Sequence, residues 1–239
     1  MPNATLKDID IKKVLPEISK KGFIKSLRKD NTGIGYTLET VMDIKENNLG
    51  EPDLSYKGIP VEMKAQRKHA SSNITLITKS PHWSPVTAKG IIEKYGYKDT
   101  QGRQGLKVTL KVTEFNTQGL KLEVTNGNLN IVHKKDGVIC YFVIDELMEK
   151  LKTKLFENLL LVFADTKVED GVEWFHYNNS ILLTELSNDG FKRLLNEGLM
   201  VWEFRMHIKE SGSVRDHGAG FRLNKRHIDQ LYAKKEKIM

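Results

Sequence analysis

Apolar side chains recur at helical spacing near the start of the chain. Residues 8–28 place them on one helical face with lysines between them, which predicts an amphipathic helix followed by a turn. A second helix is predicted from Tyr36 to Asn47, after the flexible, glycine-containing segment 31–35. Residues 47–52 then carry the Asn, Gly and Pro that end a helix and form a turn.

Strand-type patterns follow in the middle of the chain. Residues 59–64 alternate apolar and polar side chains, with Pro60 at the strand entry, where a missing backbone N–H is tolerated. Residues 74–78 predict a second strand. A meander of antiparallel strands with Asn-Gly and Asp-Gly turn signals is predicted next. Its segments are 106–113, 119–124, 129–132 and 138–144.

The rest of the chain mixes both periodicities. Residues 145–155 predict a helix, and the continuous apolar run 159–164 suits a strand that is buried on both faces. A helix near 189–197, a strand over 200–208, a glycine-rich loop and a basic helix from Lys225 are predicted to follow. This mixture predicts an α/β or α+β fold class. No repeat or linker divides the chain, so we expect one cooperative unit.

Composition narrows the class of protein. The 239 residues carry 38 Lys and Arg against 31 Asp and Glu, a net charge of +7 that is compatible with a polyanionic partner. Residues 205–239 alone hold nine basic and four acidic side chains. The single cysteine, Cys140, excludes an intramolecular disulfide and a cysteine zinc cluster. The sequence also lacks a signal-peptide pattern and a long apolar stretch, so we expect a soluble intracellular protein.

Two carboxylates and a lysine form the most informative group. Asp53 lies at a turn before the strand of residues 59–64, and Glu62 and Lys64 share one face of that strand because side chains alternate. The carboxylate oxygens of Asp53 and Glu62 are hard ligands that suit Mg²⁺, and the backbone carbonyl of Met63 is a further candidate. Lys64 is placed to orient an attacking water and to offset charge on a pentavalent phosphorus.

This group matches the PD-(D/E)xK nuclease pattern, which also arises by chance from a turn and a surface salt bridge. Glu39, on the preceding helix, is predicted to point toward the same cluster. Two other sequence patterns are weaker evidence for a functional site. Residues 33–35 lack the buried strand and the lysine of a phosphate-binding loop, and His217 and His227 lie too close together in sequence for the ββα metal site of an HNH nuclease.

Several blocks of sequence together resemble the MvaI/BcnI family of restriction endonucleases, relatives of the mismatch-repair nicking enzyme MutH. The blocks occur in the family's order at residues 29–39, 53, 62–64, 74–81 and 216–222. The resemblance implies a PD-(D/E)xK restriction-endonuclease-like fold, with a mixed sheet flanked by helices. It also implies a Mg²⁺-dependent type II restriction endonuclease that acts as a monomer on double-stranded DNA, one strand at a time. A prokaryotic cytoplasm is implied too, with a cognate DNA methyltransferase as a functional but not a physical partner.

The resemblance further implies two lobes around a DNA cleft within a single MutH-like unit. The catalytic lobe is expected over about residues 20–85 and parts of 155–185, and the recognition lobe over about 86–150 and 186–239.

By residue-to-residue match, the resemblance makes Asp53, Glu62 and Lys64 catalytic, with Glu39 as their partner on the helix. Eight residues separate Asp53 from Glu62, a longer gap than in close relatives. Either residues 55–58 form a longer hairpin, or the metal ligands must be assigned differently.

The glycine-rich segment 209–222 is predicted to read DNA, because it is polar and basic and can approach a groove closely. Arg222 suits a bidentate contact with guanine, Asp216 suits cytosine, and His217 suits a base edge or a phosphate. Further lysines are predicted to contact phosphates, which position a protein on DNA without reading its sequence. The predicted DNA contacts are Lys79, Lys89, Lys94, Lys98, Lys209, Arg215, Asp216, His217 and Arg222.

Two positions bear on the sequence that is read. Family members that read a central C·G or G·C pair carry histidines where this chain has Thr78 and Gly220, whereas members that read a central A·T or T·A pair have small residues there. We therefore predict a CC(A/T)GG-like site. Two alternatives stay open: a MutH-like strand-nicking repair endonuclease with the same active site, and a DNA-binding module without catalysis.

Overall fold

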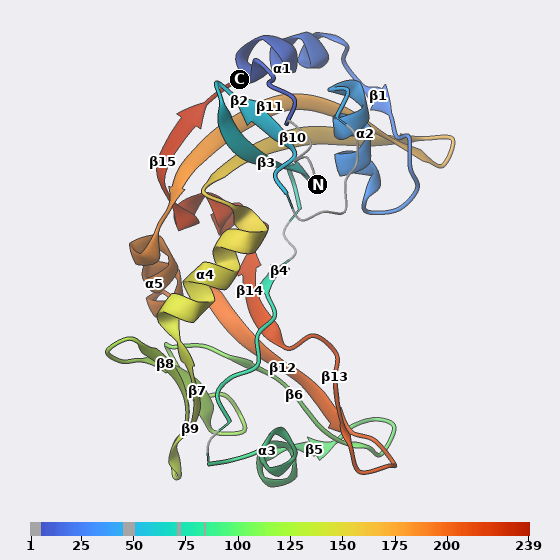
Figure 1. The fold of residues 1–239 in the computed structure, drawn as a ribbon. Coiled ribbons are helices and arrows are strands. Elements are labelled where there is room, and N and C mark those ends of the chain that lie inside the picture. The colour runs from blue at the N-terminus through green and yellow to red at the C-terminus, as the bar shows by residue number, and fades with distance from the viewer. Residues whose placement is uncertain (1–5, 45–50, 71–72, 84) are drawn as a thin grey trace, which may run out of the picture. The chain divides into compact units, whose positions relative to one another are not determined.

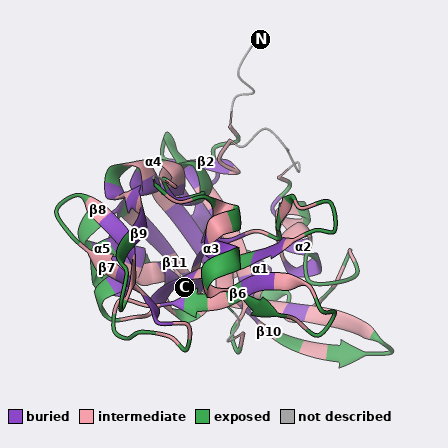
Figure 2. Ribbon diagram, turned by 90° about the horizontal axis from the view of Figure 1, so that it is seen from below, coloured by how far each residue is buried: buried purple, intermediate pink, exposed green. Residues whose placement is uncertain are grey.

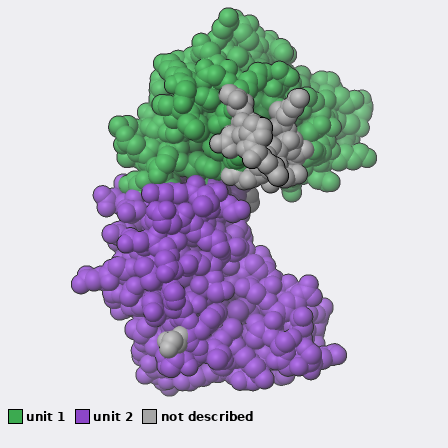
Figure 3. Space-filling view, in the orientation of Figure 1, with its two compact units in different colours: residues 1–71, 155–187, 232–239 green, residues 72–154, 188–231 purple. Residues whose placement is uncertain are grey.

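The computed structural model describes residues 6–44, 51–70, 73–83 and 85–239. They form two compact units, which Figure 3 colours separately. Unit 1 comprises Met1–Ser71, Leu155–Ser187 and Tyr232–Met239, and unit 2 comprises Ser72–Lys154 and Asn188–Leu231. These bounds differ from those of the predicted lobes at residues 73–83, which lie in unit 2, and at residues 232–239, which lie in unit 1.

Unit 1 is built on a six-stranded mixed sheet with the order β1-β11-β10-β3-β2, and β15 pairs with β11 (Figure 1). The strands are β1 (Ile24–Lys25), β2 (Leu54–Tyr56), β3 (Ile59–Arg67), β10 (Asn158–Glu169), β11 (Val172–Leu186) and β15 (Tyr232–Lys237). The β3–β10 pair is parallel and the other pairs are antiparallel. The strands predicted over 59–64 and 159–164 are thus confirmed, and the apolar run forms a buried central strand as expected.

Two helices belong to this unit. Helix α1 (Ile11–Lys20) begins at Asp10, whose side chain accepts the N–H of Lys12 at 3.2 Å, and it buries Leu15 and Ile18 as its spacing predicts. Helix α1 packs against β11, and α2 (Gly33–Val41) packs against β3. These helices and the sheet enclose an apolar core, seen among the buried residues of Figure 2.

The second predicted helix has the wrong bounds. It begins at Gly33 instead of Tyr36 and ends at Val41, while residues 45–50, including Asn47, lie outside the described part of the chain. Gly33 is not part of a flexible lead-in, because a Cβ there would lie 2.4 Å from the carbonyl oxygen of Arg28. The glycine therefore permits a close approach between the helix and the preceding loop.

Unit 2 contains two sheets (Figure 1). The larger has the order β4-β14-β12-β6-β5, with β13 paired to β12, and the smaller has the order β7-β8-β9. The strands are β4 (Asn73–Ile77), β5 (Tyr97–Lys98), β6 (Gln104–Leu110), β7 (Leu120–Val124), β8 (Asn128–His133), β9 (Gly137–Val143), β12 (Met200–Ile208), β13 (Val214–Asp216) and β14 (Gly220–Asn224).

The predicted four-segment meander is wrong in its first strand. Strands β7, β8 and β9 form the meander, with Gly127 and Gly137 at positive φ as the turn signals require. Strand β6 instead pairs with β12, which lies far along the chain. Alternation of side chains predicts a strand but does not identify its partner.

The helical segments of unit 2 are α3 (Ala88–Tyr95), α4 (Ile144–Leu155), α5 (Asn188–Asn196) and the 3₁₀ helix η1 (Lys225–Leu231). The basic helix predicted from Lys225 is wrong in its extent: η1 buries Ile228 and Leu231, and the chain then becomes strand β15. The predicted glycine-rich loop also contains β13 and β14. Among the described residues, no helix is long and apolar enough to cross a membrane.

Candidate functional site

The β2–β3 hairpin brings Asp53 beside the strand that carries Glu62. Lys57 and Gly58 turn the chain with φ of 53° and 75°, and Leu54 then pairs with Val61. In this register the Asp53 Oδ2 accepts the backbone N–H of Met63 at 2.7 Å. Residues 55–58 therefore form a hairpin that accommodates the long gap between the two acids.

Glu62 and Lys64 lie side by side on one face of β3. The Lys64 Nζ donates to Glu62 Oε1 at 2.7 Å, and their side chains are 38% and 14% exposed. The lysine side chain is therefore more accessible to solvent than the acid with which it pairs.

Burial raises the pKa of both carboxyl groups above their ordinary values. For Asp53 the N–H of Met63 and the charge of Lys64 oppose this shift. For Glu62 the charge of Lys64 opposes it, while the neighbouring Asp53 adds to it. Two partly buried acids that repel each other are stabilised by a proton or by a cation, so the donor set suits a hard divalent cation.

Glu39 does not join this pair as a third ligand. Among the residues that the structure describes, no group of three or more His, Cys, Asp or Glu side chains is arranged to hold a metal ion. Glu39 lies on α2, which packs against β3, and its Oε1 faces Gly35 at 3.7 Å from where a Cβ would be. Asp53, Glu62 and the backbone carbonyl of Met63 stay the predicted metal ligands.

Tyr232 lies near Glu62 and was not predicted. Its hydroxyl donates to the carbonyl oxygens of Leu155 at 2.8 Å and Phe156 at 3.2 Å. Burial and then the nearby charge of Glu62 raise the pKa of this phenol. Tyr232 opens β15, where a basic helix from Lys225 was predicted, so the sequence pattern did not point to it.

In unit 2 a cavity of about 330 Å³ brings together several residues predicted to contact or read DNA. Its lining comprises Thr78, Lys79, Ser80, Lys150, Asp216, Gly218 and Ala219. The Lys79 Nζ lies 2.6 Å from Glu146 Oε2 and lowers the pKa of that carboxyl. Lys150, one helical turn from Glu146 on α4, was not predicted.

The β13–β14 segment is held by its own polar side chains. Asp216 Oδ1 accepts the N–H groups of Gly218 at 2.9 Å and Ala219 at 2.7 Å. His217 Nε2 lies 2.9 Å from His207 Nδ1, and the two rings stack. Burial and then nearby arginines and lysines lower the pKa of both histidines. The predicted reading loop is therefore ordered by internal contacts that use part of its hydrogen-bonding capacity.

Arg222 is the most enclosed of the predicted reading residues. Its Nη1 donates to Thr75 Oγ1 at 2.6 Å, its Nη2 to the Gly218 carbonyl at 3.4 Å, and its Nε lies 2.5 Å from Glu203 Oε2. The last contact is an ion pair that is poorly aligned as a hydrogen bond. With 13% of its side chain exposed, Arg222 is firmly positioned, and each terminal nitrogen keeps one further N–H group.

The other predicted DNA contacts are spread over unit 2. Lys89 and Lys94 lie on α3, near Glu93 at 3.7 Å and Asp136 at 3.1 Å respectively. The remaining three are exposed, on β5, just after β12 and on β13: they are Lys98, Lys209 and Arg215.

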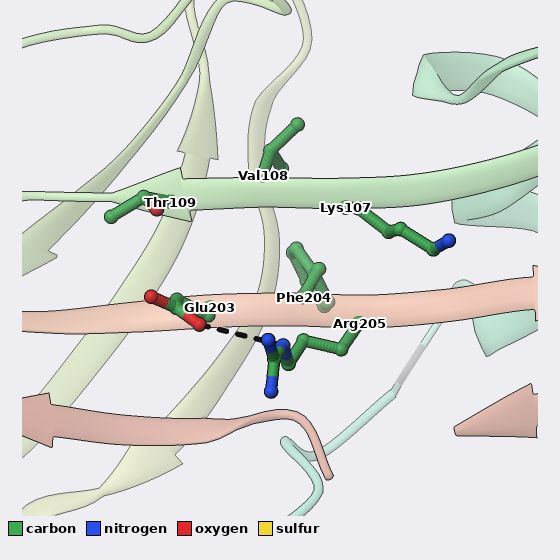
Figure 4. A pocket seen from close by; sticks show the side chains of 6 residues that line it. All are labelled: Lys107, Val108, Thr109, Glu203, Phe204 and Arg205. Carbon is green, nitrogen blue, oxygen red and sulfur yellow. Dashed lines mark ion pairs between the residues drawn. The ribbon is translucent and has the colours of Figure 1, made fainter. Parts of the chain in front are cut away.

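A second hollow lies on the β6–β12 face of unit 2, shown in Figure 4. It measures about 220 Å³ and is lined by Lys107, Val108, Thr109, Glu203, Phe204 and Arg205. Strand pairing sets Lys107 beside Arg205 and Thr109 beside Glu203. None of these residues was predicted as functional, because the two strands meet only in the folded chain.

The net positive charge of the protein comes from unit 2 alone. Unit 2 holds 21 Lys and Arg against 14 Asp and Glu, a net charge of +7, whereas unit 1 holds 17 of each. Residues 232–239, which had contributed to the predicted basic C-terminal region, belong to the neutral unit. Unit 2 is therefore the unit whose charge suits a polyanion.

Known proteins share the sequence pattern and the fold of this chain. The sequence profile of the MvaI/BcnI restriction endonuclease family matches residues 12–232. A solved complex of the restriction endonuclease MvaI with its cognate DNA substrate is 27% identical, with a TM-score of 0.66, and the match covers 96% of this chain and 97% of that one. MvaI without DNA is 25% identical, with a TM-score of 0.62 and 96% of each chain covered.

No curated protein matches the chain. The solved structures share its mixed α+β architecture over nearly its full length, which confirms the predicted fold class. Because the family profile spans most of the sequence, the chain belongs to the MvaI/BcnI restriction endonuclease family, whose members are site-specific DNA endonucleases.

Proposed function

We propose that this protein is a Mg²⁺-dependent type II restriction endonuclease that cuts double-stranded DNA at a CC(A/T)GG-like site, one strand at a time and as a monomer. The observation that carries the proposal is the convergence of Asp53, Glu62 and Lys64 at β2 and β3 in a chain of this family. A prokaryotic cytoplasm and a cognate methyltransferase are part of the same proposal.

The carboxylates of Asp53 and Glu62, with the Met63 carbonyl, are the groups that hold the metal ion. When bound, Mg²⁺ supplies Lewis acidity toward the attacking water and the phosphoryl oxygens. The Met63 N–H fixes the Asp53 carboxylate through its 2.7 Å hydrogen bond. Because the acids repel each other, their affinity for a cation is built into the apo site.

Lys64 is the residue that handles charge at the phosphate. Its Nζ stays 2.7 Å from Glu62 Oε1, so its ammonium is held at the site while its side chain remains partly exposed. From there it orients the attacking water and offsets the negative charge that develops on the phosphorus oxygens. Glu39 is proposed to act on this group from α2, without a direct place among the metal ligands.

DNA recognition is assigned to unit 2 on the basis of its charge and its reading residues. MvaI has been solved in complex with cognate DNA, and we propose the same class of ligand here. Lysines of unit 2 neutralise backbone phosphates, and the cavity that contains Thr78 and Asp216 presents donors and acceptors to base edges.

The proposed site sequence is supported by the packing of Gly220. A Cβ at this position would lie 2.6 Å from the Ile77 carbonyl oxygen, so this backbone does not accept a histidine there. Thr78 is exposed and lines the same cavity as Asp216. Small residues at both positions support an A·T or T·A pair at the centre of the site.

The test is digestion of a defined plasmid with Mg²⁺, followed by sequencing of the ends. We expect cuts in both strands at CC(A/T)GG-like sites and no cutting in EDTA. Cuts at an unrelated motif would refute the site, persistent single-strand nicks would favour the MutH-like alternative, and full activity in EDTA would refute the metal requirement.

The Lys64→Ala variant separates catalysis from binding. We expect it to keep the DNA affinity of the parent protein and to lose cleavage by more than about 100-fold. Lys68→Ala is the matched control, because Lys68 follows the same strand but pairs with Asp165 at 3.0 Å. Unchanged cleavage by Lys64→Ala would show that the active site has been assigned incorrectly.

A further inference from the structure

Glu203 is an acidic side chain that lies close to the basic side chains of Arg205 and Arg222. It lies on β12, in the unit that holds the whole net charge of the protein. It is the only acid among the six residues that line the hollow of Figure 4. An acid on a face that binds DNA repels the phosphates, so its presence calls for a compensating role.

Its contacts supply that role. The Glu203 Oε2 lies 2.5 Å from Arg222 Nε and 3.6 Å from Arg205 Nε, so one carboxylate oxygen is within ion-pair distance of two arginines from two strands. Strand register explains the arrangement, because Glu203 pairs with Gly220 on β14, two residues from Arg222, and Arg205 is two residues further along β12 on the same face.

The two arginines differ in what they can reach. Arg222 is 13% exposed and has two further partners, Thr75 and Gly218, whereas Arg205 is 49% exposed and stands beside Lys107. An arginine that reads guanine must present a fixed, planar pair of N–H groups. A carboxylate behind the guanidinium provides this orientation and reduces the entropy that is lost on binding.

We propose that Glu203 is a positioning residue that orients Arg205 and Arg222 for base recognition, and that Arg205 is a specificity-determining residue of this protein. The proposal rests on the DNA endonuclease function given above and adds the group that makes recognition selective. Glu203 touches no substrate itself. Its negative charge lowers non-specific affinity for DNA, and its contacts with the arginines raise discrimination between DNA sites.

Discrimination between sites distinguishes a positioning role of Glu203 from a simple effect of its charge. Removing an acid from a DNA-binding face strengthens non-specific binding, whether or not the acid positions anything. If Glu203 positions arginines, its removal also weakens discrimination between the cognate site and a variant site. Simple charge removal would leave the ratio of the affinities for the cognate and variant sites unchanged.

The experiment measures dissociation constants in a Lys64→Ala background, for the site mapped with the parent enzyme and for the same duplex with one G·C pair inverted. We expect Glu203→Ala to lower the affinity ratio by about 10- to 100-fold, the worth of one bidentate base contact, and to raise affinity for the inverted duplex. Glu203→Gln, which keeps an oxygen acceptor, should give an intermediate ratio. Glu210→Gln is the control, because it removes one exposed charge just after β12 and should leave the ratio unchanged.

A double-mutant cycle completes the test. In an Arg205→Ala and Arg222→Ala background, Glu203→Ala should have no further effect on the ratio, because the groups that it positions are gone. An unchanged ratio in both Glu203 variants, or an additional full loss in the arginine-free background, would overturn the proposal. If the Lys64→Ala protein itself does not prefer its mapped site, the proposed function fails instead, so the two failures are distinguishable.

Discussion

Glu62 combines an ion pair with an unfavourable environment. Lys64 stabilises its charged form, but burial and the adjacent Asp53 destabilise that form more, and its pKa is raised above 4.5. A carboxyl whose pKa is raised in the folded state stabilises the protein below its unfolded pKa, and this stabilisation is lost as the pH rises through the folded pKa. The apo active site is therefore a source of instability at neutral pH.

Glu62→Gln should remove this instability together with the activity. We expect cleavage to fall by more than about 100-fold, because a proposed metal ligand is lost, and the melting temperature of the metal-free protein at pH 7 to rise. Between pH 4.5 and 7 the parent protein should lose stability relative to the variant. Calorimetric melts across this pH range test the sign, and a variant that is less stable at pH 7 would contradict it.

Metal binding should stabilise the folded parent protein and so offset the instability of its metal-free site. A cation that binds the folded state adds RT ln(1 + [L]/Kd), about 2.7 kcal/mol at one hundred times Kd. We expect Mg²⁺ or Ca²⁺ to raise the melting temperature of the parent protein and to have little effect on Glu62→Gln. Equal metal stabilisation of both proteins would place the metal site elsewhere.

At the scale of an element, helix α2 contains two glycines with opposite roles. A Cβ at Gly33 would meet the Arg28 carbonyl at 2.4 Å and Ser26 Oγ at 2.5 Å, whereas a Cβ at Gly35 would meet nothing closer than Glu39 Oε1 at 3.7 Å. Gly33→Ala should therefore cost about 1–3 kcal/mol through overpacking. Gly35→Ala should add about 0.5–1 kcal/mol, because alanine loses less backbone freedom in a helix.

Urea unfolding measures the free energy of unfolding of Gly33→Ala and Gly35→Ala, and each variant is the control for the other. If Gly33→Ala were as stable as the parent protein, the close approach at the start of α2 would not exist. The segment would then behave as the flexible lead-in that its glycines suggested.

An element can be predicted from the sequence when its own side-chain pattern determines its conformation, and not when its conformation depends on contacts with distant residues. Helix α1 and strands β3 and β12 were predicted because their own side chains alternate or recur on one face. Strand β15 was not, because its lysines and glutamate resemble an exposed helix, and its conformation depends on pairing with β11. Strand β11 itself was not predicted.

The candidate site divides in the same way. Asp53, Glu62 and Lys64 were predicted because a hairpin joins neighbours in sequence. The contact between Glu203 and Arg222 was not predicted, because it depends on the pairing of β12 with β14, and the pattern of a strand does not identify its partner.

At the scale of the whole molecule, the separation of charge predicts which lysines bind DNA. Reversing two exposed lysines of unit 2, Lys98→Glu with Lys209→Glu, should weaken non-specific DNA binding and reduce the slope of log K against log salt by about 2. The matched change in unit 1, Lys13→Glu with Lys29→Glu, alters the net charge equally at exposed positions.

Unit 1 carries no net charge, so we expect the unit 1 variant to have a much smaller effect on DNA binding. Fluorescence anisotropy with a random duplex over a salt series makes the comparison. Equal losses in both variants would mean that only total charge matters and that unit 2 is not the DNA-binding unit.

The path of the chain through unit 1 has a consequence for synthesis in a cell. Strand β3 carries Glu62 and Lys64, but its parallel neighbour β10 begins only at Asn158, after most of unit 2 has been made. At about 5–20 residues per second, a ribosome needs roughly 5–20 s to cover that interval. For those seconds a nascent chain holds the proposed catalytic residues without the parallel strand that flanks β3 in the folded sheet, and its proposed activity on the host's DNA is delayed until β10 has been made.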